Sequence, residues 1–165
     1  MDLARVLRHL ISPPWTVGRA FSSGTMQAIE AAIKESEAGH QGEIRFAVEA
    51  ALEISPLLKN QAAGERAVEV FSQLRVWDTQ HNNGVLIYLL LADRDVEIVA
   101  DRGIHQHVGK DGWEKICREM EALFRQGRFE KGAITAIKAV SLHLAKHYPG
   151  QSQNINELPD TPVIL

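Results

Sequence analysis

The sequence predicts an α/β protein, a three-layer α/β/α sandwich in which a small mixed sheet carries helices on both faces. Helical and strand periodicities alternate along 165 residues, a length typical of one domain. A strand, a helix and a second strand follow one another, an order that requires a parallel β-α-β unit with a right-handed crossover. A short charged turn then adds a β-hairpin, and the remaining helices suffice to cover both faces.

The first segment, residues 1–21, is predicted to be an amphipathic appendage. Apolar side chains recur at helical spacing, and Pro13-Pro14 ends the pattern: Leu3, Val6, Leu7, Leu10 and Ile11. Arg8 and His9 interrupt the apolar run that a signal peptide would need. We expect this helix to dock on the domain, and as alternatives to contact a partner or, through residues 1–15, a membrane surface.

The α/β domain is predicted over residues 22–149. Its first helix begins after Ser22 and ends near Gly39, and a strand from Glu43 then places Ile44, Phe46 and Val48 on one face. The elements expected after a polar connection are a helix over 62–77, strands over 85–91 and 96–100, and helices over 113–125 and 129–148. The tail, residues 150–165, is expected to be extended.

Composition excludes several classes of protein. The net charge of −3 gives no global basic field, so no nucleic-acid partner is expected. The single cysteine, Cys117, excludes an internal disulfide and is predicted to be a small buried hydrophobe. No run reaches the roughly eighteen apolar residues of a membrane span. A cytoplasmic protein is the resulting expectation.

The stretch "HNNGVLIYLLLADRDVEIVADRGI" carries the strongest functional signal. Parallel strands begin at one edge of a sheet, and an antiparallel third strand ends there. We therefore expect five side chains to converge from distant segments: Glu43, Asp78, Asn82, Asn83 and Asp101. Carboxylate and amide oxygens are hard ligands suited to Ca²⁺, with Mg²⁺ as the alternative. The competing interpretation makes Asn83-Gly84 a simple turn and Asp101 a helix cap.

The opposite end of the hairpin carries Asp93-Arg94-Asp95. Three charged residues in a short connection between strands are typical of a turn exposed to solvent. We expect these side chains to be solvated. The His143 and His147 pair, four residues apart on the last helix, is likewise expected on a solvated face.

The chain resembles the TPM domain family. The family pattern, roughly T-x-x-x-N-G-V-L-[IL], a strand, D-R, a second strand, D-x-G-[IL], V-G and W, is matched here by Thr79, Asn83 to Ile87, Asp93-Arg94, Asp101, Gly103-Ile104, Val108-Gly109 and Trp113. Gly42-Glu43-Ile44 resembles the first strand of the family. "FRQGRFEKGAITAIKAV" and "NELPD" resemble short, soluble bacterial members, and the similarity covers about residues 23–160.

The resemblance implies an α/β/α sandwich and two biochemical roles. A thylakoid member is described as an acid phosphatase, and some bacterial members bind Ca²⁺ through an acidic cluster at the sheet edge. By motif match such a site falls on Asp101 and Asn83, with Glu43 beside them. Members often carry arginine just before the Asn-Gly pair, where this chain has Asn82, and that departure counts against a phosphatase.

Two functions follow as expectations. One is a Ca²⁺-binding interaction module for a protein partner, in which the ion orders the loops at the sheet edge. The alternative is a metal-dependent phosphatase acting on phosphate esters, with Asp101 as the candidate catalytic residue.

Overall fold

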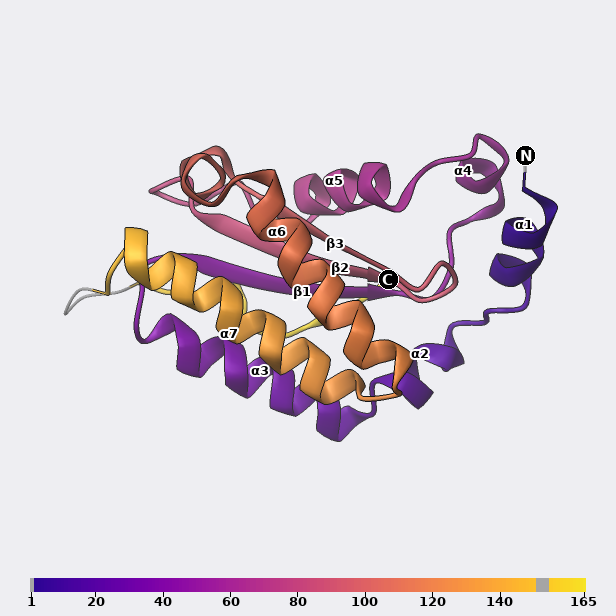
Figure 1. Ribbon diagram of the computed structural model, residues 1–165, viewed down its shortest axis with the longest axis horizontal. Helices are drawn as coiled ribbons and strands as arrows, with labels where there is room; N and C mark the ends of the chain where they lie inside the picture. Colours follow the sequence, from indigo (N-terminus) through magenta and orange to yellow (C-terminus); the bar gives the residue numbers. More distant parts are fainter. Residues whose placement is uncertain (1, 151–154) are drawn as a thin grey trace.

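We describe a computed structural model of the chain over residues 2–150 and 155–165. Its elements follow the order α1 (Leu3–Leu10), α2 (Trp15–Ala20), α3 (Ser23–Glu37), β1 (Glu43–Glu49), α4 (Ile54–Leu58), α5 (Ala63–Gln73), β2 (Gly84–Leu90), β3 (Asp95–Ala100), α6 (Arg102–Arg125), α7 (Phe129–His147) and β4 (Val163–Ile164). Figure 1 shows the sheet lying between two layers of helices.

The sheet has the order β3-β2-β1-β4. Strands β1 and β2 are parallel, from Glu43 opposite Gly84 to Glu49 opposite Leu90. Strand β3 returns antiparallel to β2, so that Ala100 pairs with Val85. The predicted β-α-β unit and hairpin are therefore confirmed. The sequence did not predict β4, in which Val163 pairs in parallel with Ala47 of β1.

Alternating side chains of the strands separate two cores. Ile44, Phe46 and Val48 pack with residues of α3, α6 and α7 on one face. On the other face, Ala47 of β1 and Leu86, Tyr88 and Leu90 of β2 pack against α5. This alternation follows from the two-residue period of a strand. The predicted three-layer sandwich is confirmed, with α5 as one outer layer and α3, α6 and α7 as the other.

Three local features differ from the expected elements. The polar connection after β1 contains a short helix, α4. Helix α6 begins at Arg102 rather than near Trp113, with a break at Gly109, where φ is 71° and ψ 170°. Glycine adopts such a positive φ without a steric penalty, so two helical segments can follow one another without a loop.

Within the described residues, no helix is both long and apolar enough to cross a membrane.

Candidate functional site

The starts of β1 and β2 and the end of β3 meet at one edge of the sheet, as expected. Glu43 pairs with Gly84 across the parallel strands. The backbone N–H of Asp101 donates to the Gly84 carbonyl oxygen at 2.9 Å. Asn83 directly precedes this glycine. The fold thus brings Glu43, Asn83 and Asp101 to a common edge from segments nearly sixty residues apart in the sequence.

Asp101 is the N-cap of α6. Its Oδ1 accepts the backbone N–H of Arg102 at 2.7 Å, and its φ and ψ of −64° and 157° are the extended values of a cap. This confirms the capping interpretation of the sequence. The second carboxylate oxygen, Oδ2, is buried and has no hydrogen-bond partner. One oxygen of Asp101 therefore serves the helix, and the other faces the edge without a protein donor.

Asn83 is fully buried. Its amide Nδ2 donates to the Gln41 carbonyl oxygen at 3.0 Å, which orients the side chain. Its Oδ1 is buried and, like Asp101 Oδ2, has no hydrogen-bond partner. A buried polar atom left without a partner costs about 1–3 kcal/mol, and native proteins leave few such atoms. Asn83 Oδ1 and Asp101 Oδ2, from the residue before Gly84 and the residue that donates to its carbonyl oxygen, thus have no hydrogen-bond donor.

Glycine at position 103 allows the loop before β2 to lie against the first turn of α6. A Cβ there would lie 2.4 Å from the Asn82 carbonyl oxygen, 2.7 Å from the Tyr148 hydroxyl and 2.8 Å from the His81 carbonyl oxygen. Asn82 itself adopts a left-handed φ of 52°. Burial, followed by the charge of Asp101, raises the pKa of Tyr148. Two carbonyl oxygens and a neutral hydroxyl therefore lie close to the first turn that Asp101 caps.

The carboxylate oxygens of Glu43 are already hydrogen-bonded to the C-terminal tail. Glu43 is 1% exposed, and its two carboxylate oxygens accept the backbone N–H groups of Glu157 and Leu158 at 3.1 Å each. Burial is the main cause that raises its pKa, and the two backbone hydrogen bonds oppose that effect. At this edge Glu43 binds the C-terminal tail.

Asp78 and Asn82 contribute differently from the other predicted ligands. The Asp78 carboxylate is exposed and forms an ion pair with Arg75 at 2.7 Å. Asn82 is exposed, and its carbonyl oxygen accepts the Ile104 N–H at 3.3 Å. The five predicted side chains are therefore not gathered into one shell. No group of three or more His, Cys, Asp or Glu side chains in the described part of the chain could hold a metal ion.

Sequence reasoning missed a buried polar cluster beside Glu43. Arg45 donates through Nη1 to the carbonyl oxygens of Pro159 and Thr161, on the tail that Glu43 also binds. Glu37 of α3 accepts the Ile44 N–H at 2.8 Å and is hydrogen-bonded to Asp160. The signal was present in β1, whose α5 face reads Glu43, Arg45, Ala47 and Glu49. Three charged side chains on one face of a central strand require buried partners.

The Glu37 carboxyl predicts a pH-dependent stability. Burial raises its pKa from 4.5 to about 9, so the folded state favours the protonated form. Its contribution to stability is complete below the unfolded pKa and is lost as the pH rises towards about 9. Glu37→Gln, which stays neutral, is expected to raise the free energy of unfolding at pH 8 by about 1–2 kcal/mol. Urea unfolding between pH 5 and pH 9 measures this, with exposed Glu35→Gln as the control. An equal pH profile in wild type and Glu37→Gln contradicts the assignment.

In the charged turn at the other end of the hairpin, Arg94 is exposed as expected, but Asp93 is not solvated. Asp93 has a side chain only 11% exposed, because it accepts hydrogen bonds from Arg5 and His9 of α1. His147 stacks on His107 with ring centroids 4.3 Å apart, and His143 lies edge-on to Trp113. His143 and His147 have intermediate exposure, so they are only partly solvated, and His107 on α6 is exposed. Cys117, by contrast, is buried as predicted, and burial raises its pKa to about 12.

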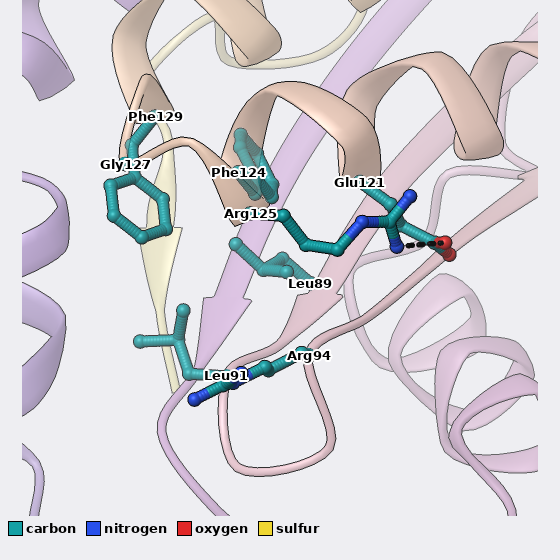
Figure 2. A pocket seen from close by; sticks show the side chains of 8 residues that line it. All are labelled: Leu89, Leu91, Arg94, Glu121, Phe124, Arg125, Gly127 and Phe129. Atoms are coloured by element: carbon teal, nitrogen blue, oxygen red, sulfur yellow. Dashed lines mark ion pairs between the residues drawn. The ribbon is translucent and has the colours of Figure 1, made fainter.

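A cavity of about 320 Å³ lies at the end of the sheet opposite Asp101. Figure 2 shows apolar side chains around it: Leu89, Leu91, Phe124 and Phe129. Its charged lining residues are Arg94 and the Arg125–Glu121 pair, whose charged groups are 3.6 Å apart. None of the predicted site residues lines this cavity. The lining suits a small apolar group, but offers no buried polar atom that would orient one.

Comparisons with known proteins agree with the fold. The model of the TPM domain matches residues 18–142. The NMR structure of BA42 protein from the psychrophilic bacterium Bizionia argentinensis is 32% identical, with a TM-score of 0.77, over 88% of this chain and 95% of that one. The N-terminal domain of a P. gingivalis protein shares the fold at 17% identity, with a TM-score of 0.60, over 85% of this chain and 94% of that one. No curated protein matches the chain.

Proposed function

This chain belongs to the TPM domain family, and we propose that it is an interaction module that binds Ca²⁺, with Mg²⁺ as the alternative ion, through Asn83 and Asp101. The observation that carries the proposal is the pair of buried oxygens without a partner, Asn83 Oδ1 and Asp101 Oδ2. Both are hard donors of the type that these ions prefer. A bound cation would satisfy both oxygens at once.

The surroundings supply further oxygen donors. Ca²⁺ takes six to eight oxygen ligands, including backbone carbonyls and waters. The carbonyl oxygens of His81 and Asn82 and the Tyr148 hydroxyl surround Gly103, next to Asp101. With one carboxylate and the positive end of the α6 dipole nearby, the affinity is expected to be weak, about 10⁻⁴–10⁻³ M. This is the range of an ion that orders a surface in a calcium-rich setting.

The ion would act on the loop that precedes β2. Residues 81–83 lie against the first turn of α6 through the Ile104 N–H to Asn82 carbonyl contact of 3.3 Å. A cation shared by Asn83 and Asp101 would join this loop to the helix. The ordered loop would then be the surface offered to a protein partner.

The alternative, a metal-dependent phosphatase, has less support. Asp101 would be its catalytic residue, yet one of its carboxylate oxygens caps α6 at 2.7 Å from the Arg102 N–H. The position before Asn83-Gly84 carries Asn82 rather than a cation that could bind phosphate. Hydrolysis of a phosphate ester should therefore be measured together with metal binding, so that the two functions can be told apart.

The test is a calcium titration followed by two-dimensional amide NMR, with magnesium in parallel. We expect saturable shifts at residues 81–84 and 101–104. Asp101→Asn preserves the helix cap, since asparagine caps as well as aspartate, but removes the charge. It should weaken calcium binding by about tenfold or more. Asp2→Asn is the matched control, because the Asp2 carboxylate also caps a helix, accepting the N–H groups of Ala4 and Arg5 at the start of α1.

Three outcomes decide between the functions. Shifts at the edge that Asp101→Asn removes, without phosphate-ester turnover, support the binding module. Metal-dependent turnover of p-nitrophenyl phosphate that Asp101→Asn abolishes supports the phosphatase. If neither ion shifts any of these amides at millimolar concentration, the cation site is wrong and Asp101 is a helix cap alone.

A further inference from the structure

Helix α1 carries an exposed apolar face. The exposed fractions of Leu3, Leu7, Leu10 and Ile11 are 73%, 59%, 59% and 67%, and that of Trp15 at the start of α2 is 61%. His9 on the same helix is only 4% exposed. At 3.6 residues per turn, Arg5 and His9 share the side of the helix opposite Leu3 and Leu7. The usual arrangement of a surface helix, with its apolar stripe towards the core, is therefore inverted here.

Buried polar contacts maintain this orientation. Arg5 donates to the Asp93 carboxylate through Nε and Nη2 at 3.0 Å and 2.8 Å, and to the Gln61 carbonyl oxygen at 2.7 Å. His9 Nδ1 accepts the Leu52 N–H at 2.9 Å, so its proton is on Nε2, which donates to Asp93 at 3.0 Å. Rotating the apolar face inward would break all of these contacts. It would also leave the Asp93 charge without partners.

Five exposed apolar residues lie close together in the sequence of α1 and α2. Single apolar side chains on a surface need no explanation, but a contiguous patch of a few hundred Å² marks an interaction site. Four of the five residues lie on and just after α1 and the fifth begins α2, and we call the set the α1 face: Leu3, Leu7, Leu10, Ile11 and Trp15. Figure 1 shows α1 at one end of the molecule, beyond the hairpin end of the sheet.

The charges around the α1 face are basic. The Arg8 side chain is 50% exposed, and the Arg19 guanidinium lies 5.6 Å from the centre of the Trp15 ring. Asp2 is the only carboxylate in residues 2–21, and it caps α1. Asp93 pairs with Arg5 at 2.8 Å and forms a longer ion pair with Arg8 at 3.6 Å. The α1 face therefore combines leucines and a tryptophan with two arginines, of which Arg8 is half exposed beside Asp93.

We propose that the α1 face docks on a lipid surface that carries anionic headgroups. Leucine and tryptophan enter the headgroup boundary of a bilayer, and arginines beside them attract acidic lipids. A second copy of the chain fits less well, because Arg8 and Arg19 would meet the same cations on the partner. The contacts of Arg5 and His9 with Asp93 would hold α1 on the domain while its apolar side enters the lipid. Asp93 and Asp101 lie at opposite ends of β3, so this proposal does not depend on the cation site.

The full chain is tested by cosedimentation with phosphatidylcholine vesicles, with and without phosphatidylglycerol. We expect binding that is stronger to the anionic vesicles. Leu7→Gln combined with Leu10→Gln should weaken binding by about tenfold or more, since each leucine loses the free energy of apolar burial. Val68→Gln combined with Leu142→Gln is the matched control, because these residues are 54% and 74% exposed on other helices. This control should bind as the wild type does.

Each other result overturns the proposal. Absence of vesicle binding by the wild type does so directly, and so does equal loss of binding in the two double variants. Sedimentation velocity without lipid tests the remaining alternative, in which a second copy of the chain binds the α1 face. If the wild type forms a dimer that Leu7→Gln with Leu10→Gln dissociates, while vesicles bind neither protein, the α1 face is an interface between two copies of the chain.

Discussion

Glu43→Ala is expected to detach the C-terminal tail from the sheet and to lower the free energy of unfolding by about 3 kcal/mol. Glu43 is buried and accepts the backbone N–H groups of Glu157 and Leu158. Its removal leaves both donors without a partner inside the protein. The cost extends along the chain, because the tail continues into β4, which pairs with Ala47 and Val48 of β1.

Two measurements check this result. Urea unfolding gives the loss of stability, and amide exchange at Leu158 and Leu165 reports whether the tail is released. Leu165 is informative because its N–H donates to the Val48 carbonyl oxygen at 2.9 Å. The control is Glu119→Ala, an exposed glutamate on α6 that should change stability by no more than about 0.5 kcal/mol. Unchanged exchange of both amides in Glu43→Ala contradicts the role assigned to Glu43.

Glu49→Ala is expected to cost about 3–5 kcal/mol, as breaking a buried ion pair from one side usually does. Glu49 is 6% exposed and binds Arg66 through two hydrogen bonds of 2.9 Å and 3.1 Å. The Tyr88 hydroxyl donates to the same carboxylate at 2.6 Å. Burial, and then this hydrogen bond, raise the pKa of Tyr88, so the hydroxyl remains a donor at ordinary pH. Without Glu49, the Arg66 guanidinium and the Tyr88 hydroxyl are both left without that acceptor.

A neighbouring glutamate separates the effect of burial from the effect of charge. Glu69 also pairs with Arg66, at 3.1 Å, but its side chain is 51% exposed. Glu69→Ala should cost no more than about 0.5 kcal/mol, because solvent screens an exposed pair. Tyr88→Phe should cost about 1 kcal/mol for the lost hydrogen bond. Equal losses for Glu49→Ala and Glu69→Ala in urea unfolding would show that the burial of the Glu49 network is not what stabilises the protein.

Much of the sheet was predictable because the sequence patterns that mark its strands are local. The alternation of Ile44, Phe46 and Val48 marks the buried face of a strand at any place in a fold. The strand order and the hairpin then follow from chain topology, and topology alone brings Glu43, Asn83 and Asp101 to one edge. The cap at Asp101 was also predictable, because a cap depends on the next few residues. The three-layer class of the domain rests on these local signals.

Which groups bind these side chains was not predictable, because their partners are distant in the sequence. Glu43 was expected to be a ligand, but the backbone of Glu157 and Leu158 binds its oxygens, and no side-chain pattern in the tail announces a backbone donor. Asp93 was expected in solvent, but α1 returns across more than eighty residues to cover it.

The sequence by itself thus determined the layers, the parallel β-α-β unit with its hairpin, and the edge at which polar side chains meet. Periodicity and turn chemistry are properties of neighbouring residues. Only the tertiary structure decided which oxygens at that edge remain without a partner, Asn83 Oδ1 and Asp101 Oδ2. It also decided that α1 turns its apolar side outward, because turning it inward would leave the partly buried Asp93 carboxylate without Arg5 and His9. Whether a polar group is paired depends on segments that approach only when the chain has folded.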